Sequence, residues 1–110
     1  MSVLNRGAAI AEMGDDLEIY AAVVDSFLED CPLTFGKLRE ALLSQDAEAV
    51  HRHAHSLKSA SRTVGGEDAG EAAFILEKAT GAGDLSTTAV MVDILERELS
   101  LLTTELKKHF

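Results

Sequence analysis

Hydrophobic residues recur at steps of three and four along most of the chain, which is the pattern of amphipathic helices. The first long run begins after Asp15 or Asp16, either of which can cap a helix. Its inward positions are expected to be Leu17, Tyr20, Val24, Phe27 and Cys31. Pro32 either opens a new helix or kinks a continuing one. The apolar stripe then continues to about Ser44 through Leu33, Leu38, Leu42 and Leu43.

Two further helices follow a turn at Gln45-Asp46, where Asp46 is the expected N-cap. The first is predicted over residues 47–64 and ends at Gly65-Gly66, because glycine commonly caps the C-terminal end of a helix. The second starts at Glu67-Asp68, and small residues in its buried stripe allow a neighbouring helix to approach closely. That stripe consists of Ala69, Ala72, Ala73, Leu76 and Ala79.

The pattern ends with a loop, Gly81-Ala82-Gly83-Asp84, and a last helix that Ser86 is expected to cap. This helix runs to about Lys108, and its inward residues are predicted to be Met91, Leu95, Leu99, Leu102 and Leu106. A short helix over residues 8–13 precedes the others. The prediction is therefore an all-α antiparallel four-helix bundle with a short N-terminal extra helix, folded as a single domain over residues 1–110.

The amino-acid composition agrees with a fold of packed helices and limits which kinds of partner the protein can bind. Aromatic residues make up only 5% of the chain, so aliphatic side chains must build the core. The formal net charge of −9 argues against nucleic acid as a partner, because binding to phosphates needs cations. Seven acids and no Lys or Arg lie between Gly7 and Gly36, which indicates a solvated face or one that repels wrong partners.

The cysteine count and the lack of long apolar runs argue against several classes of protein. Cys31 is the only cysteine, so an internal disulfide is impossible, and it is expected to pack as a small hydrophobic residue. No apolar run is long enough to span a membrane, and the N-terminus lacks a signal-peptide core. A cytoplasmic protein without membrane attachment is expected, and nothing in the sequence demands a dimer, so a monomer is predicted.

The helix predicted over residues 47–64 carries the chemistry. At 100° per residue, the face around His55 holds His51, Arg52, Lys58, Ser59 and Arg62, with Glu48 a further turn back. The opposite side holds Val50, Ala54, Leu57, Ala60 and Val64. His55 should therefore face solvent on a rigid helix, and His53 should lie near the apolar side.

A solvent-facing imidazole can act as a nucleophile toward a phosphoryl group, because much of it is neutral near pH 7. The cations on its face should favour the neutral form and then stabilise the phosphoryl oxygens. Lys58 is the best placed for this, one turn along, and Arg62 is second. An alternative is a metal site, since His51 and His55 are spaced i, i+4 with Glu48 nearby, but the cations on the same face oppose it.

The run His55-Ser56-Leu57-Lys58-Ser59, followed by Ser61 and Gly65, resembles the signature of histidine-containing phosphotransfer (HPt) domains of two-component phosphorelays. The resemblance covers roughly residues 12–106. Phe27-Leu28-Glu29-Asp30-Cys31-Pro32 and Leu38-Arg39-Glu40-Ala41-Leu42 resemble the family's preceding helices. Leu76-Glu77-Lys78-Ala79 and Gly83-Asp84 resemble the stretch after the motif.

The resemblance implies that His55 is the phosphorylated histidine and that Lys58 is the cation beside the phosphoryl group. Ser59 would be the small residue that gives an incoming receiver domain room. The expected partner-binding residues are Ser59, Arg62, His51 and Arg52. Ser59 stands where Gly is commoner in the family, and Gly66 where Ala is more usual, but serine is still small and Gly66 bears on the turn.

The implied partners are response-regulator receiver domains and a sensor or hybrid histidine kinase. His55 would take a phosphoryl group from a receiver aspartate and pass it to another. Mg²⁺ would belong to the receiver, so no cofactor is expected here. Gly81-Ala82-Gly83 is too short to be a phosphate loop, and a phosphocarrier without its own ATP site is predicted.

Two alternative interpretations are compatible with the same fold. One is a docking module that binds receivers without being phosphorylated, against which the pairing of His55 with Lys58 argues. The other is a domain excised from a larger hybrid or chemotaxis kinase, although Met1 suggests a free-standing protein.

Overall fold

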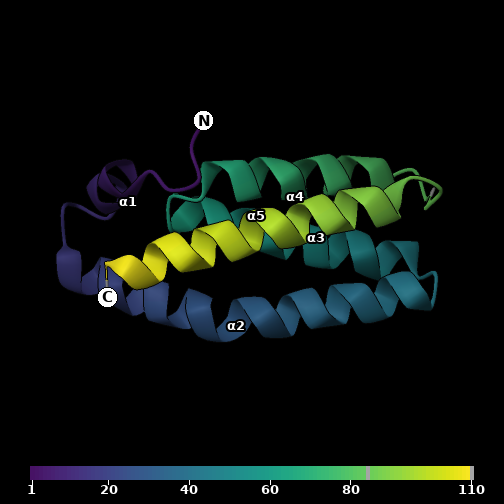
Figure 1. Cartoon of the computed structure of the whole chain (residues 1–110), viewed down its shortest axis with the longest axis horizontal. Coiled ribbons are helices and arrows are strands. Elements are labelled where there is room, and N and C mark those ends of the chain that lie inside the picture. The colour runs from purple at the N-terminus through teal and green to yellow at the C-terminus, as the bar shows by residue number, and fades with distance from the viewer. Residues whose placement is uncertain (84, 110) are drawn as a thin grey trace.

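Five helices form the part of the chain that the computed structural model describes, residues 1–83 and 85–109. They are α1 (Arg6–Glu12), α2 (Leu17–Leu43), α3 (Ala47–Thr63), α4 (Glu67–Thr80) and α5 (Thr88–Lys108) (Figure 1). No strand occurs within these residues. The all-α bundle with a short extra helix, predicted from the hydrophobic pattern, is confirmed.

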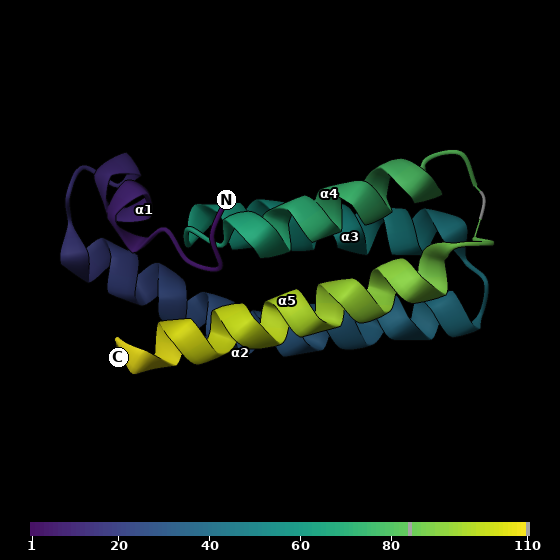
Figure 2. The same cartoon turned by 45° about the horizontal axis from the view of Figure 1, so that its top comes forward.

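The four long helices run along the longest dimension of the molecule, which measures 41 × 23 × 20 Å (Figure 2). The α2–α3 turn and the α4–α5 loop lie at one end, and the α3–α4 turn lies at the other with α1 (Figure 1). Packing is most extensive between α3 and its neighbours α4 and α2, whereas α2 and α5 meet only loosely. The helix α3 is therefore held on two sides.

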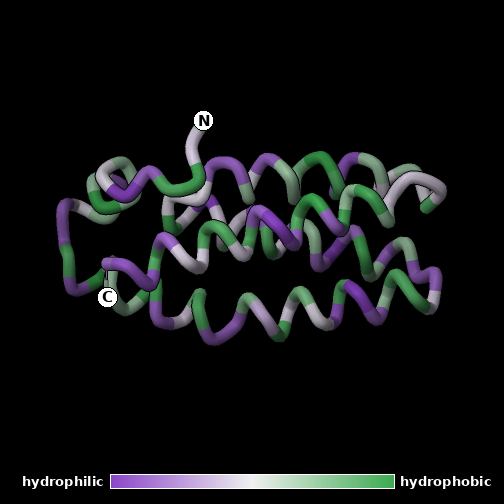
Figure 3. The backbone as a smooth tube through the Cα atoms, in the orientation of Figure 1, coloured by the Kyte–Doolittle hydropathy of each residue, from purple (hydrophilic) through white to green (hydrophobic). Residues whose placement is uncertain are grey.

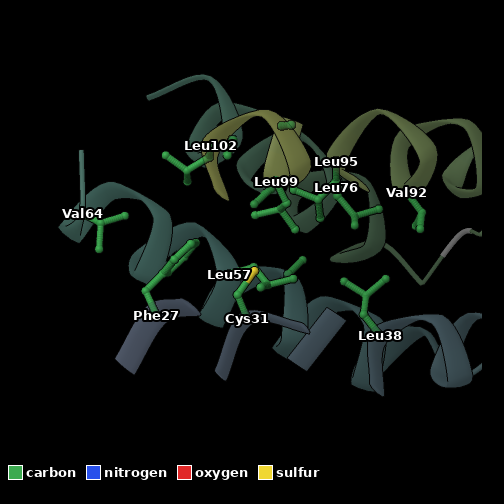
Figure 4. Packing of buried hydrophobic residues seen from close by; sticks show 14 of the residues in the cluster. Phe27, Cys31, Leu38, Leu57, Val64, Leu76, Val92, Leu95, Leu99 and Leu102 are labelled. Atoms are coloured by element: carbon green, nitrogen blue, oxygen red, sulfur yellow. The ribbon is translucent and has the colours of Figure 1, made fainter. Parts of the chain in front are cut away.

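The core lies between the four long helices. Along each helix, hydrophobic positions (green) alternate with hydrophilic ones (purple), as expected for helices with one buried face (Figure 3). Figure 4 shows side chains from all four helices meeting there. The labelled set is Phe27, Cys31, Leu38, Leu57, Val64, Leu76, Val92, Leu95, Leu99 and Leu102, all of which are buried. Aliphatic residues supply most of this core, as the composition predicted.

Helix α2 is one continuous helix of 27 residues that contains Pro32, so Pro32 does not open a new helix. Three inward predictions along it are wrong, because Leu17, Leu33 and Leu43 are exposed. Leu33 and Leu43 each follow a buried residue, Cys31 and Ala41, by two positions, which is about 200° around a helix. Leu17 is the first residue of the helix.

Side-chain caps set several helix ends. Asp16 accepts hydrogen bonds from the backbone N–H groups of Glu18 and Ile19, and Asp46 accepts one from Ala49, as the sequence predicted. The short helix begins at Arg6 and not at residue 8, because the Asn5 side chain caps it through the N–H of Ala8.

The start of the last helix differs from the expected cap at Ser86. Thr87 is the N-cap residue, and α5 begins at Thr88, which is buried and whose hydroxyl donates to the Leu85 carbonyl at 2.7 Å. Residues 81–83 form the expected loop, and Asp84 lies outside the described residues. Met91 and Ala79, both predicted inward, are half-buried.

The α3–α4 turn is fixed from three directions. Gly65 has a φ of +95°, which favours glycine, and its carbonyl accepts a 2.7 Å hydrogen bond from the Asn5 N–H. A Cβ on Gly66 would collide with Leu102 of α5. The buried Tyr20 hydroxyl donates to the Val64 carbonyl at 2.8 Å. The end of α3 is thus anchored by α2, α5 and the N-terminal segment.

No helix in the described residues is both long and apolar enough to cross a membrane.

Candidate functional site

Helix α3 holds His55 outward, as its hydrophobic pattern predicted. The helix buries Val50, Ala54 and Leu57 against its neighbours. His55 lies on the other side, and 58% of its side chain is exposed. A helix packed on two sides therefore presents an accessible imidazole at a fixed position.

Glu77 of α4 contacts both His55 and Lys58, the two residues that the sequence predicted to take part in the chemistry. Its Oε2 lies 2.5 Å from Nδ1 of His55, and its Oε1 lies 2.6 Å from Nζ of Lys58. An ionised carboxylate only accepts hydrogen bonds, so the proton of the neutral imidazole must lie on Nδ1. The lone pair is then on Nε2, which is free to act as a nucleophile.

The charge state of Glu77 follows from these contacts. Only 13% of its side chain is exposed, and this burial by itself disfavours the ionised form. The hydrogen bond from Lys58 and then that from His55 outweigh burial, and they hold the pKa of Glu77 below its ordinary value. The carboxylate is therefore ionised near pH 7.

The surroundings of His55 differ from the predicted cationic face. The group in contact with the ring is the Glu77 carboxylate, and Lys58 is largely covered, with 17% of its side chain exposed. Arg62 turns toward α4, where its NH2 nitrogen lies 3.9 Å from Glu71 and its guanidinium lies over the Phe74 ring. The sequence placed these cations on one face, but the packing of α4 against α3 redirects them.

Two of the other predicted residues, His51 and Arg52, lie at a shallow hollow beside His55. Its lining consists of Glu48, His51, Arg52, His55, Ser56 and Glu77. His51 is half-buried, and its Nδ1 lies 2.8 Å from the backbone carbonyl of Glu77. Arg52 and Ser59 are exposed. His53 is half-buried, and this burial, followed by the positive charge of Arg52, lowers its pKa.

The arrangement does not favour the metal-site alternative. Nδ1 of His51 and Nδ1 of His55 are both engaged with Glu77, one with its carbonyl and the other with its carboxylate. Within residues 1–83 and 85–109, no group of three or more His, Cys, Asp or Glu side chains is placed to hold a metal ion.

A second hollow lies between α2 and α3, next to the turn of helix that carries His55. Its α2 side includes Phe27 and Cys31, and its α3 side includes Ser56, Leu57 and Ala60. Its lining is mostly apolar and adjoins the exposed imidazole through Ser56. Cys31 is buried, which raises the pKa of its thiol to about 11, so it packs as the sequence predicted and holds little thiolate.

Comparison with known proteins agrees with this geometry. The family model of the Hpt domain matches residues 22–107, and the chain therefore belongs to the Hpt domain family. Among solved structures, it is similar to the crystal structure of histidine-containing phosphotransfer protein B (HptB) from Pseudomonas aeruginosa PAO1. The TM-score is 0.87 at 25% sequence identity, and the match covers 96% of this chain and 92% of that chain. No curated protein sequence matches the chain.

Family and structural likeness together make this chain a histidine phosphotransfer protein of phosphorelay signalling. Hpt proteins are phosphocarriers, and membership implies interaction with receiver domains and kinases.

Sequence reasoning missed Glu77 as a member of the site. It appeared only as part of the stretch Leu76-Glu77-Lys78-Ala79 that resembles the family. A 22-residue separation from His55 gives no local signal. Its position on α4, one residue after the buried Leu76, was the only hint that it lies at the edge of a helix interface.

Proposed function

We propose that Nε2 of His55 is the phosphoacceptor of this phosphotransfer protein. The observation that carries the proposal is the 2.5 Å contact between Nδ1 and the Glu77 carboxylate on a ring that is otherwise exposed. This contact leaves the Nε2 lone pair free and keeps the ring from rotating. Positioning of this kind supplies much of the rate enhancement in phosphoryl transfer.

The transfer is an in-line displacement at phosphorus. The Nε2 lone pair forms the N–P bond while the bond between phosphorus and the receiver's aspartate oxygen breaks, and the aspartate leaves as a carboxylate. The product ring carries a proton on Nδ1 and a phosphoryl group on Nε2, so it gains positive charge. The adjacent negative charge of Glu77 stabilises that ring. Attack by a second receiver's aspartate reverses these steps.

Lys58 and Ser59 assist this transfer in different ways. Lys58 lies one turn from His55, and its Nζ, now 2.6 Å from Glu77, supplies a positive charge for the phosphoryl oxygens. Ser59 is exposed and small, which leaves room for the receiver's active site. Mg²⁺ is expected on the receiver domain, and no cofactor is proposed for this chain.

The receiver is proposed to dock over the exposed face that combines the α2–α3 hollow with Ser59, Arg62, His51 and Arg52. The hollow supplies apolar surface next to the reacting ring. Receiver domains and a sensor or hybrid kinase are the proposed partners, and the chain is proposed to act without an ATP site of its own. The cytoplasmic location and the monomeric state stay predictions.

The deciding experiment incubates the protein with receiver domains carrying radiolabelled phosphoryl groups. Wild-type protein should acquire an acid-labile, alkali-stable label, and His55→Gln should acquire none. His109→Gln, which removes another exposed histidine, is the matched control and should be labelled normally. Label on His55→Gln equal to wild type would show that another residue accepts the group. Binding of receivers with no label on the wild type would instead favour the docking module.

A second experiment tests where the receiver docks. Ser59→Trp should block transfer by filling the space beside His55, whereas Ser100→Trp, at an exposed serine of α5, should transfer normally. Undiminished transfer by Ser59→Trp would mean that the receiver approaches from another side.

A further inference from the structure

One aromatic ring on α4 gathers three cations. The centroid of the Phe74 ring lies 5.5 Å from Lys58, 5.5 Å from Arg62 and 5.4 Å from Lys78. These distances are within the range of cation–π attraction, which is about 6 Å. We call Phe74 with these three cations the basic cluster. It holds three of the chain's ten Lys and Arg residues around one half-buried side chain.

The three cations are neutralised to different extents. Lys58 is paired with Glu77 at 2.6 Å. Arg62 lies 3.9 Å from Glu71, at the limit of an ion pair, and half of its side chain is exposed. Lys78 is exposed, and no ion pair to it occurs within the part of the chain that the structure describes. Positive charge therefore remains available to a partner on the Lys78 and Arg62 side of the cluster.

Gly70 makes the position of Arg62 possible. It is buried inside α4, and a Cβ at this residue would lie 2.7 Å from Cγ of Arg62. The Arg62 side chain thus crosses α4 where that helix has no side chain, and so reaches Phe74. A glycine inside a helix costs roughly 1 kcal/mol relative to alanine. The cluster is thus a built arrangement of α3 and α4, which a bulkier residue at position 70 would disturb.

An acidic stretch of sequence reaches the other side of the site. The segment between Gly7 and Gly36, which includes α1 and much of α2, contains seven acids and no Lys or Arg. Asp30 of this segment lines the apolar α2–α3 hollow. Asp30 on the α2 side of α3 and the basic cluster on its α4 side therefore give the two sides of the site opposite charges.

From this asymmetry we infer that the basic cluster is a second docking surface, which binds an acidic surface of the receiver domain and fixes the direction in which the receiver lies across His55. The inference rests on the proposed function and adds the chemistry of the partner's surface to it. An apolar hollow alone does not distinguish one orientation of a partner from its reverse. A positive patch on the α4 side and the acid Asp30 on the α2 side favour a single orientation of the receiver, and they repel receivers whose charges are arranged the other way round.

Charge reversal at Lys78 tests the inference, because this residue contacts Phe74 and lies outside the contacts of His55 and Glu77. The receiver is the one that, from a panel loaded with acetyl phosphate, labels wild-type protein fastest. Lys78→Glu should lower kcat/KM for this receiver about tenfold, through KM more than kcat, since electrostatic steering changes association rates by ten-fold or more. Its rate should also depend less on salt than that of wild type.

Lys107→Glu is the matched control. It makes the same change of net charge at an exposed lysine on the last turn of α5. It should retain the wild-type KM and salt dependence. Equal rates for Lys78→Glu and Lys107→Glu would overturn the inference, because net charge alone would then explain any effect.

Gly70→Ala displaces Arg62 without changing any charge. This variant should fold, since alanine favours helix and the flexible arginine can move aside. Its KM for the same receiver should rise several-fold, and a KM equal to wild type would show that the arrangement around Phe74 is immaterial to docking. Failure of the proposed function is distinguishable, because wild-type protein would then carry no label, or His55→Gln would be labelled as strongly as wild type.

Discussion

Replacement of Glu77 by alanine tests the geometry of the site most directly. Glu77→Ala removes the acceptor that lies 2.5 Å from Nδ1 of His55 and 2.6 Å from Nζ of Lys58. The imidazole can then rotate and take either tautomer, so that Nε2 carries the proton part of the time. Lys58 loses the contact that holds its ammonium group beside the ring.

The expected loss can be estimated from the hydrogen bond to His55. A hydrogen bond to a charged group contributes about 1.5–3 kcal/mol. If the contact strengthens by this amount as the ring gains positive charge in the transition state, its loss slows transfer about 10- to 160-fold, since 1.36 kcal/mol corresponds to tenfold. Glu77→Gln keeps an amide oxygen for Nδ1 but loses the charge, so its rate should lie between those of Glu77→Ala and wild type.

The assay is rapid-quench measurement of labelled phosphoryl transfer from a saturating phosphorylated receiver. Saturation isolates the chemical step from docking. Glu71→Ala is the control, because Glu71 lies on the same helix and its ion-pair contact is with Arg62, at 3.9 Å. Transfer by Glu77→Ala at the wild-type rate would refute the view that this carboxylate orients the nucleophile.

Three further predictions follow from named contacts. Lys58→Ala should slow transfer on the order of 10- to 100-fold while far-UV circular dichroism is retained, and an unchanged rate would remove Lys58 from the mechanism. Tyr20→Phe should lower the free energy of unfolding by about 1–3 kcal/mol in urea titration, because the buried Val64 carbonyl loses its 2.8 Å partner; equal midpoints would contradict this. The hydrogen bond from Lys58, and then that from His55, hold the pKa of Glu77 below the ordinary 4.5. Wild type should therefore be more stable than Glu77→Gln by the full amount above pH 4.5, and this difference should decline as pH falls through the native pKa of Glu77. A difference in the free energy of unfolding that does not change with pH would be inconsistent with the lowered pKa.

Local chemistry made much of the fold predictable. Asp16 and Asp46 cap helices through their own nearby backbone N–H groups, so a short stretch of sequence contains both partners. Gly65 ends α3 for a similarly local reason, a positive φ. Two predictions failed because hydrophobicity was not weighed against the angle around the helix. Leu33 and Leu43 belong to an apolar run, but each lies about 200° from a buried residue of the same helix and is exposed.

The sequence by itself determined the helix that carries His55 and the outward direction of that residue, because helical periodicity relates residues a few positions apart. It also indicated that Lys58 lies one turn from that histidine. Only the tertiary structure decided what touches the imidazole. The carboxylate of Glu77 comes from α4, and the packing of α4 on α3 brings it to His55 and Lys58. Periodicity contains no information about which side chains meet across two helices, so the sequence predicted cations beside His55 but not the carboxylate that contacts both His55 and Lys58.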